Sequence, residues 1–98
     1  DTLVGWMNEV APADLNKAVD YLGLDENEGY VWGMLRGGMG SVADLFITQM
    51  QDYLELDNAA RMNTPGTAEG NWQWRMSADA ITPELTEKIA TLTALYDR

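Results

Sequence analysis

The chain has 98 residues, with 16 acidic and 6 basic side chains and a formal net charge of −10. Such a surface repels phosphate backbones and anionic membranes, so we expect neither nucleic acid nor membrane as a partner. Cysteine and histidine are absent, which excludes disulfides, thiolate nucleophiles, imidazole bases and metal sites built on those residues; we expect no cofactor and no metal.

The length suits one small domain or part of a larger one. No apolar run approaches the roughly 20 residues that a membrane span needs, and no signal-peptide pattern is visible. We therefore expect a cytoplasmic protein. The chain opens at Asp1 rather than at methionine, which favours a segment cut from a longer protein.

The first part of the chain is predicted to be helical. The apolar stretch Thr2–Asn8 suits a short helical turn. Pro12 fits the first position of a second helix, which Gly23 can end. The acidic stretch Leu24–Gly29 is then expected to form a solvated connector, because charge runs usually face water. Tyr30–Arg36 predicts another short helix.

Two motifs in this part resemble ligand loops, and both fail on position. Gly37–Gly40 contain a G-x-G, but a dinucleotide loop follows a strand and opens a helix, whereas these glycines follow a helix. We expect them to end that helix. The connector resembles a calcium loop, but the twelfth position counted from Asp25 is Arg36 and not glutamate.

Ser41–Leu54 is predicted to be a β-strand. Val42, Phe46 and Ile47 are good β-formers, and the centre is apolar on both faces, as in a strand buried in a parallel sheet. A single strand cannot pair its own backbone N–H and C=O groups. We therefore expect it to pair with the remainder of a larger sheet or with a second copy of the chain.

A long loop then leads to a last helix. Thr82 can cap this helix, Pro83 fits its first position, and Glu84 suits the positive end of its dipole. Its apolar stripe is Leu85, Ile89, Leu92 and Leu95. The order helix, strand, loop, helix predicts an α/β fold in which residues 1–98 are a single partial domain, a slice of a β/α barrel that is mostly helical by itself. In such barrels the loop after a strand builds the active site.

That loop contains ARMNTPGTAEGNWQWR, which ends at Arg75. Its indoles offer flat faces to sugar C–H groups, and its Asn, Gln and Arg side chains offer paired hydrogen bonds to hydroxyls, so carbohydrate is a reasonable ligand. The alternative is structural: Trp72 and Trp74 anchor the loop to the final helix, and Arg75 pairs with a carboxylate. The residues alone favour this alternative, because large aromatic side chains usually serve packing.

Four motifs resemble the C-terminal part of 4-α-glucanotransferases of the amylomaltase (disproportionating enzyme) family, glycoside hydrolase family 77. They are DTLVGW (Asp1–Trp6), SVADLFITQMQDYLEL (Ser41–Leu56), ARMNTPGTAEGNWQWR and ITPEL (Ile81–Leu85), and together they cover essentially the whole chain. The resemblance implies the C-terminal slice of an elaborated (β/α)8 TIM barrel. Ser41–Leu54 would hold its last strand and Thr82–Tyr96 its closing helix.

The resemblance also implies transfer of α-1,4-glucan segments between malto-oligosaccharides with retention. Retention requires a nucleophilic carboxylate and a second carboxyl as acid/base, about 5 Å apart. The resemblance places both outside this chain, together with a third acidic residue in a His-Asp-Asn stretch directly before Asp1. We therefore expect no catalytic residue in residues 1–98 and no activity from them alone. Asp52 is expected to have a structural role.

What the resemblance leaves to this chain is a loop that lines the substrate cleft. A sugar-contacting asparagine of the family matches Asn63, and Pro65 and Gly66 shape the turn that presents it. A second sugar contact, a serine in some members, falls at Glu69, which can still accept hydroxyl protons. The expected partners are α-1,4-glucans or malto-oligosaccharides. The alternative function is a stand-alone carbohydrate-binding or oligomeric assembly module without catalysis.

Overall fold

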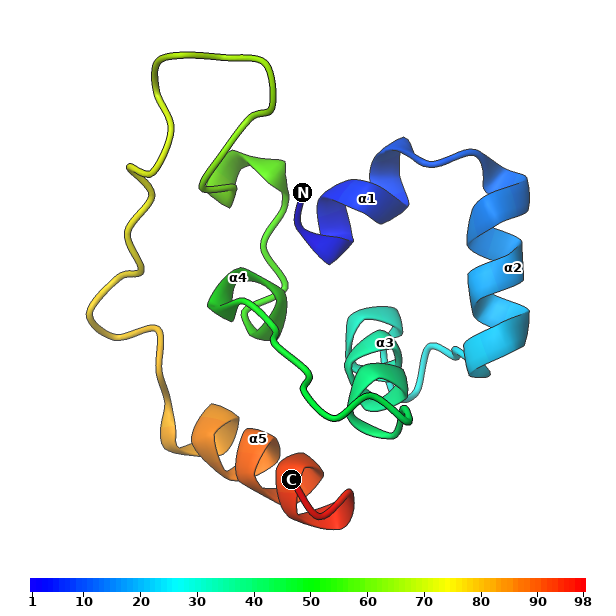
Figure 1. The fold of residues 1–98 in the computed structure, drawn as a ribbon. Helices are drawn as coiled ribbons and strands as arrows, with labels where there is room; N and C mark the ends of the chain where they lie inside the picture. The colour runs from blue at the N-terminus through cyan, green and yellow to red at the C-terminus, as the bar shows by residue number, and fades with distance from the viewer.

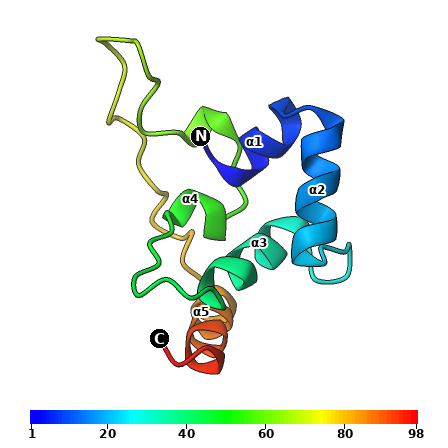
Figure 2. The same ribbon diagram turned by 45° about the vertical axis from the view of Figure 1, so that its right-hand side comes forward.

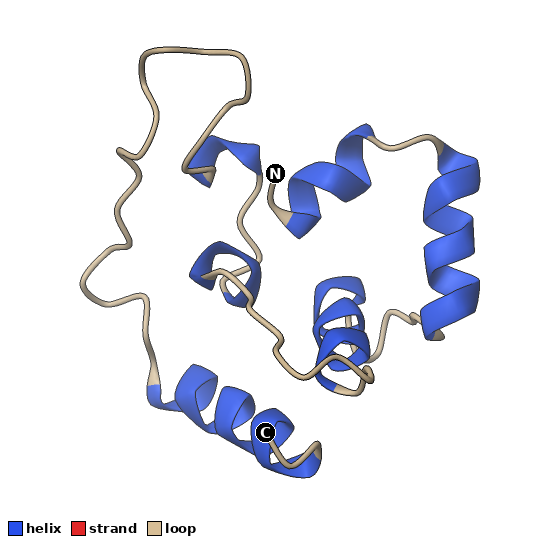
Figure 3. Cartoon of the chain, viewed as in Figure 1, coloured by secondary structure: helices blue, strands red, loops and turns tan.

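The computed structural model describes all residues 1–98 and contains helices but no strand (Figures 1 and 3). Its elements are α1 (Leu3–Glu9), α2 (Pro12–Leu22), α3 (Tyr30–Met39), α4 (Met50–Tyr53), the 3-10 helix η1 (Asn58–Ala60) and α5 (Pro83–Leu95). No helix has both the length and the hydropathy that crossing a membrane takes.

Local capping sets most of the helix ends that were predicted. The Thr2 hydroxyl accepts a hydrogen bond from the Gly5 N–H at the start of α1, and the Thr82 hydroxyl accepts one from the Leu85 N–H at the start of α5. Gly23 ends α2 in the left-handed region, with φ 64°. These signals act between close neighbours in the chain, which is why those at Gly23 and Thr82 could be predicted.

The core surrounds α3, which lies at the centre of the helices in Figure 2. Val31, Trp32 and Leu35 form its buried centre, and Leu35 is only 1% exposed. Partly buried side chains from α1, α5 and the intervening segments pack against this centre: Leu3, Val4, Met7, Phe46, Tyr53, Leu85, Ile89 and Leu92. Three of the four residues expected in the stripe of α5 are among them. The fourth, Leu95, is mostly exposed, so its expected burial is wrong.

The prediction that Gly37–Gly40 end α3 is right for Gly40, which caps the helix, and wrong for Gly37 and Gly38. The helix continues through Gly37 and Gly38 to Met39. A Cβ atom on Gly38 would lie 2.2 Å from Cε1 of Phe46, and one on Gly37 would lie 2.6 Å from Cδ2 of Leu22. These glycines therefore allow neighbouring side chains to approach the helix, and this packing outweighs their poor helix propensity.

The acidic connector between α2 and α3 is a turn, as predicted, and it is tied to α3. The Glu28 carboxylate accepts hydrogen bonds from Nε and Nη2 of Arg36 at 2.8 and 3.1 Å. The hydrogen bond with Glu28 also raises the pKa of Arg36. Arg36 Nη2 donates a further bond to the Leu22 carbonyl at 2.8 Å, so one guanidinium joins the end of α2 to α3.

The strand predicted over Ser41–Leu54 is absent. Residues 41–49 form no helix or strand, and residues 50–53 form α4. No second strand lies beside this segment to accept its backbone hydrogen bonds, and a strand cannot persist without one. Phe46 packs against the core, but Val42 and Ile47 are exposed. The α/β class is therefore wrong for this chain by itself, whereas the mostly helical structure expected of an isolated slice is observed.

Candidate functional site

The candidate site is the loop between η1 and α5, residues 61–82, which extends away from the helices in Figures 1 and 2. All three residues predicted to contact substrate, Asn63, Pro65 and Glu69, lie on this loop and are exposed. The side chains of Asn63 and Glu69 make no hydrogen bond within the chain, in contrast to that of Asn71. Their polar atoms are therefore free to meet a ligand.

A tight turn follows Asn63 directly. The Thr67 N–H donates to the Thr64 carbonyl at 3.3 Å, which places Pro65 and Gly66 at the two central positions. Gly66 has φ 81°, a value that suits glycine in the second central position of a type II turn, and proline is favoured in the first. Pro65 and Gly66 thus shape this turn, as expected from the sequence.

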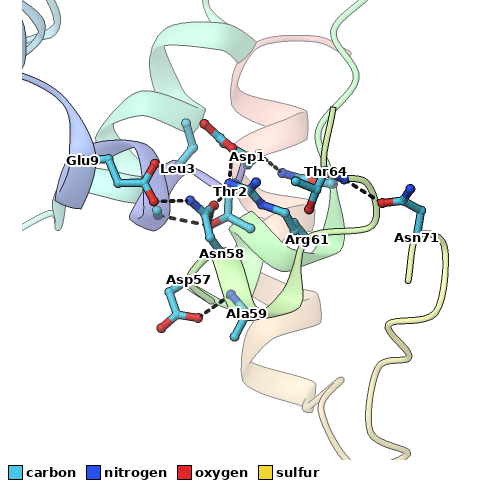
Figure 4. Close-up of polar contacts among 12 residues, drawn as sticks. Asp1, Thr2, Leu3, Glu9, Asp57, Asn58, Ala59, Arg61, Thr64 and Asn71 are labelled. Atoms are coloured by element: carbon cyan, nitrogen blue, oxygen red, sulfur yellow. Dashed lines mark hydrogen bonds and ion pairs between the residues drawn. The ribbon is translucent and has the colours of Figure 1, made fainter. Parts of the chain in front are cut away.

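The structure reveals a second polar residue in the loop, Asn71, to which the sequence analysis gave no role. Its Oδ1 accepts a hydrogen bond from the Thr64 N–H at 2.8 Å (Figure 4). Its Nδ2 donates to the carbonyl of Thr67 at 3.1 Å. One side-chain amide therefore bridges the loop. The bond to Thr64 reaches back seven residues, which is farther than the short side-chain-to-backbone patterns that a sequence indicates, so no local signal predicted it.

A backbone hydrogen bond also joins the two ends of residues 62–72, the first half of this loop. The Trp72 N–H donates to the Met62 carbonyl. Trp72 adopts a left-handed backbone with φ 62°, unusual for a residue other than glycine, and Gly70 beside it has φ 78°. Residues 62–72 therefore form a closed loop with its own internal hydrogen bonds.

The structure does not confirm that the two tryptophans anchor the loop to the final helix. Trp72 is 71% exposed and does not anchor the loop to α5. Trp74 is half-buried and lines a small hollow. The other apolar residues of that hollow come from the segment after α4 and from the same loop as Trp74, and none belongs to α5: Leu54, Leu56, Met76 and Ala80. Arg75 is exposed and forms no ion pair, since the two ion pairs of the chain involve Arg36 and Arg61.

A polar cluster anchors the base of the loop to the N-terminal segment (Figure 4). Arg61 Nη2 forms an ion pair with Asp1 Oδ1. Gln49 Nε2 donates to the Asp1 carbonyl at 2.9 Å, and Gln51 Nε2 donates to the Ala60 carbonyl at 3.1 Å. Residues 48 and 60 positions apart in the chain thus hold the start of α1 and the base of the loop together.

Asn58 is the centre of this cluster. Its Oδ1 accepts a hydrogen bond from the Thr2 N–H at 3.0 Å, and its Nδ2 donates to Glu9 Oε1 at 3.1 Å. It can lie over α1 because residue 5 is glycine: a Cβ atom there would be 2.0 Å from Asn58 Oδ1. Sequence analysis assigned no role to this pair, because the contact joins residues far apart in the chain.

Asp52, which lies outside the loop, has a structural role. Asp52 is buried, and its Oδ1 accepts a hydrogen bond from the Leu3 N–H at 2.7 Å, where the first turn of α1 leaves a backbone donor without a helical partner. The structural role expected for Asp52 is thereby confirmed. No group of three or more acidic side chains is arranged to hold a metal ion. The chemistry that the loop offers is hydrogen bonding to a polar ligand.

The comparisons with known proteins agree on one family. A family model described as 4-alpha-glucanotransferase matches residues 1–82. The chain is 46% identical over its full length to a 4-alpha-glucanotransferase of Clostridium butyricum and 44% identical to one of Synechocystis, and it spans 20% and 19% of those proteins. The chain thus corresponds to a small part of these relatives.

A solved structure gives the same result. The fold matches an amylomaltase from Streptococcus agalactiae, solved in complex with acarbose, with a TM-score of 0.93 and 32% sequence identity. The match covers 99% of this chain and 20% of the amylomaltase. Sequence and fold lead to the same conclusion, and the chain belongs to the 4-alpha-glucanotransferase family.

Proposed function

We propose that this chain is the substrate-lining part of an enzyme that transfers α-1,4-glucan segments between malto-oligosaccharides with retention. The observation that carries the proposal is the free amide of Asn63, exposed beside a tight turn in a chain of this family. A side-chain amide both donates and accepts hydrogen bonds, as a sugar hydroxyl does, so one asparagine can contact two neighbouring hydroxyls. Glu69, exposed on the same loop, can accept a further hydroxyl proton.

The proposal places the bond-breaking chemistry in the rest of the enzyme. A retaining transfer needs two carboxyl groups about 5 Å apart, one as nucleophile and one as acid/base. The only buried carboxylate in this chain is Asp52, which accepts a hydrogen bond from the α1 backbone. We infer that residues 1–98 bind and position the glucan, and that the reacting carboxyls come from the remaining part of the protein.

We also infer that residues 41–49 become a strand of a (β/α)8 barrel when the rest of the protein is present. Two features support this inference. The segment already avoids helical structure, and its apolar side chains Val42, Leu45 and Ile47 are exposed in this chain alone. Neighbouring strands would pair its backbone groups and cover these side chains. If a second copy of the chain supplies the pairing strand instead, light scattering of the 98-residue chain will give a mass that rises with concentration.

The activity is tested with maltotriose, following glucose and maltopentaose. We expect the whole protein that contains this chain to produce both, and the 98-residue chain to produce neither. The separate chain must first show helical circular dichroism, so that a lack of product is not caused by unfolding. Transfer by the 98-residue chain would contradict the proposal, because it would require a catalytic pair among these residues.

The role of Asn63 is tested by Asn63→Ala in the whole protein. A lost neutral hydrogen bond contributes about 0.5–1.5 kcal/mol, so we expect the maltotriose KM to rise by about two- to tenfold. Asn16→Ala is the matched control, because Asn16 is an exposed asparagine on α2, away from this loop. Equal kinetics for both variants would show that the loop does not contact the glucan through Asn63.

A stand-alone binding module makes a different prediction. Maltoheptaose would then cause a saturable change in the tryptophan fluorescence of the 98-residue chain. We expect no saturable change without the rest of the cleft.

The cytoplasmic location remains a prediction from the sequence.

A further inference from the structure

We infer that Asn71 is a positioning residue that, together with Thr67, holds Asn63 in the orientation needed to contact substrate. The inference rests on the proposed function of the loop and deepens it. Asn71 is only half-exposed and points into the loop, whereas Asn63 has no partner in the chain. Their roles are therefore different: Asn63 contacts the ligand, and Asn71 fixes the conformation of the backbone next to Asn63.

The hydrogen bonds around Asn71 form one consistent set. The backbone N–H of Thr64 can only donate, so the Asn71 atom 2.8 Å away must be the oxygen, which fixes the orientation of the amide. The Asn71 Nδ2 then donates to the carbonyl and the hydroxyl of Thr67, each at 3.1 Å. The Thr67 hydroxyl has one proton and donates it to the Thr64 carbonyl at 2.7 Å, which is shorter than its 3.3 Å contact with Asn71 Oδ1.

Apart from the Thr64–Thr67 turn, no interaction outside this set orders the tip of the loop. Every hydrogen bond made by residues 63–70 has its partner within residues 64–71, and none reaches a helix. The only other tie across the loop is the bond from Trp72 to Met62 at its base. Few buried contacts and exposed hydrogen bonds mark a segment that opens easily. The conformation of the peptide that follows Asn63 therefore depends on the Asn71 amide.

Loss of this amide has a defined kinetic consequence. A disordered loop must be ordered when the glucan binds, which weakens binding. Contacts of a positioned asparagine are present both in the bound substrate and in the transition state, so their loss raises KM and leaves kcat nearly unchanged. A general loss of folding would instead lower the amount of active enzyme and reduce kcat.

The test uses the whole protein that contains this chain, with maltotriose as substrate. We expect Asn71→Ala to raise KM by about tenfold, with kcat within about twofold of wild type. Thr67→Val, which removes the hydroxyl and keeps the shape, should raise KM in the same direction. Thr67→Ser keeps the hydroxyl and should restore the wild-type KM. Asn71→Asp keeps the acceptor for the Thr64 N–H and should lie between Asn71→Ala and wild type.

Hydrogen exchange supplies a readout that does not depend on activity. The Thr64 amide should exchange faster in Asn71→Ala, whereas amides of α3 should exchange at the wild-type rate. Unchanged exchange at Thr64, or faster exchange with an unchanged KM, overturns the inference. A fall in kcat with a constant KM overturns it as well. If the wild-type protein itself does not transfer glucan, the proposed function fails first, and that result is distinct from a failure of Asn71 in an active enzyme.

Discussion

The contact between Gly5 and Asn58 predicts an unusual response to a helix-favouring substitution. Gly5 lies inside α1, where alanine is intrinsically more favourable than glycine by about 1 kcal/mol. Here, however, a Cβ atom would lie 2.0–2.4 Å from the Oδ1, Cγ and Nδ2 atoms of Asn58. We therefore expect Gly5→Ala to destabilise the protein, because Asn58 must leave its position.

The expected loss of stability follows from the hydrogen bonds that Asn58 makes. When it moves, the Thr2 N–H loses its acceptor, and Thr2 is 1% exposed, so water does not readily replace that acceptor. An unsatisfied buried donor costs about 1–3 kcal/mol. The bond to Glu9 is exposed and contributes less. After the gain in helix propensity, we expect the free energy of unfolding to fall by about 1–2 kcal/mol.

The assay is a double-mutant cycle in the whole protein, followed by denaturant unfolding and by hydrogen exchange of the α1 amides. Asn58→Ala removes all three clashing atoms together with the hydrogen bonds. In that background, Gly5→Ala should become stabilising by up to about 1 kcal/mol, because only helix propensity remains. Asn8→Ala, at an exposed position of the same helix, is the control and should change stability by a few tenths of a kcal/mol.

The change of sign between the two backgrounds is the decisive result. If Gly5→Ala destabilises equally with Asn58 present and absent, the cost does not come from Asn58. If it stabilises the wild-type background, the side chain of Asn58 moves aside freely, and the cluster at the start of α1 is weaker than its geometry indicates.

Two further predictions concern the core. Leu35→Ala should lower the free energy of unfolding by about 2–5 kcal/mol, because Leu35 is 1% exposed and its removal leaves a cavity; a loss below about 1 kcal/mol in denaturant unfolding would contradict its central place in the core. Burial raises the pKa of Tyr53, so the unfolded chain releases this proton at a lower pH than the folded chain does. The unfolded state then binds fewer protons, and stability should fall as pH rises through about 10, the unfolded pKa of tyrosine. Tyr53→Phe should remove this part of the pH dependence; identical denaturant midpoints against pH for both proteins would refute it.

The sequence allowed some parts of the fold to be predicted because their causes are local. Thr82 caps α5 through a bond to the backbone three residues away, and Gly23 ends α2 through its own left-handed φ. The position of Pro65 and Gly66 in a tight turn has the same origin. The motifs also identified the family, because residue identities at fixed spacing need no structure to be recognised.

Long-range contacts account for the errors. An apolar run such as Ser41–Leu54 suits a strand, but a strand forms only beside a partner, and this chain contains none. Gly37 and Gly38 suit a helix end, but the side chains of Leu22 and Phe46 occupy the space beside them and keep them within α3. The pairing partner of the strand is missing from this chain, and the neighbours of the glycines come from distant segments. Neither fact leaves a sign in the local sequence.

The sequence alone therefore determined the helix ends at Gly23 and Thr82, the turn after Asn63 and the family to which the chain belongs. Only the tertiary structure showed that Asn58 and Arg61 bind the N-terminal segment, that Gly5 makes room for Asn58, and that Asn71 closes the loop around Thr64. The physical reason is distance along the chain: a cap or a turn is decided within a few residues, whereas Thr2 and Asn58 meet across 56 positions, and that contact exists only once the helices have packed.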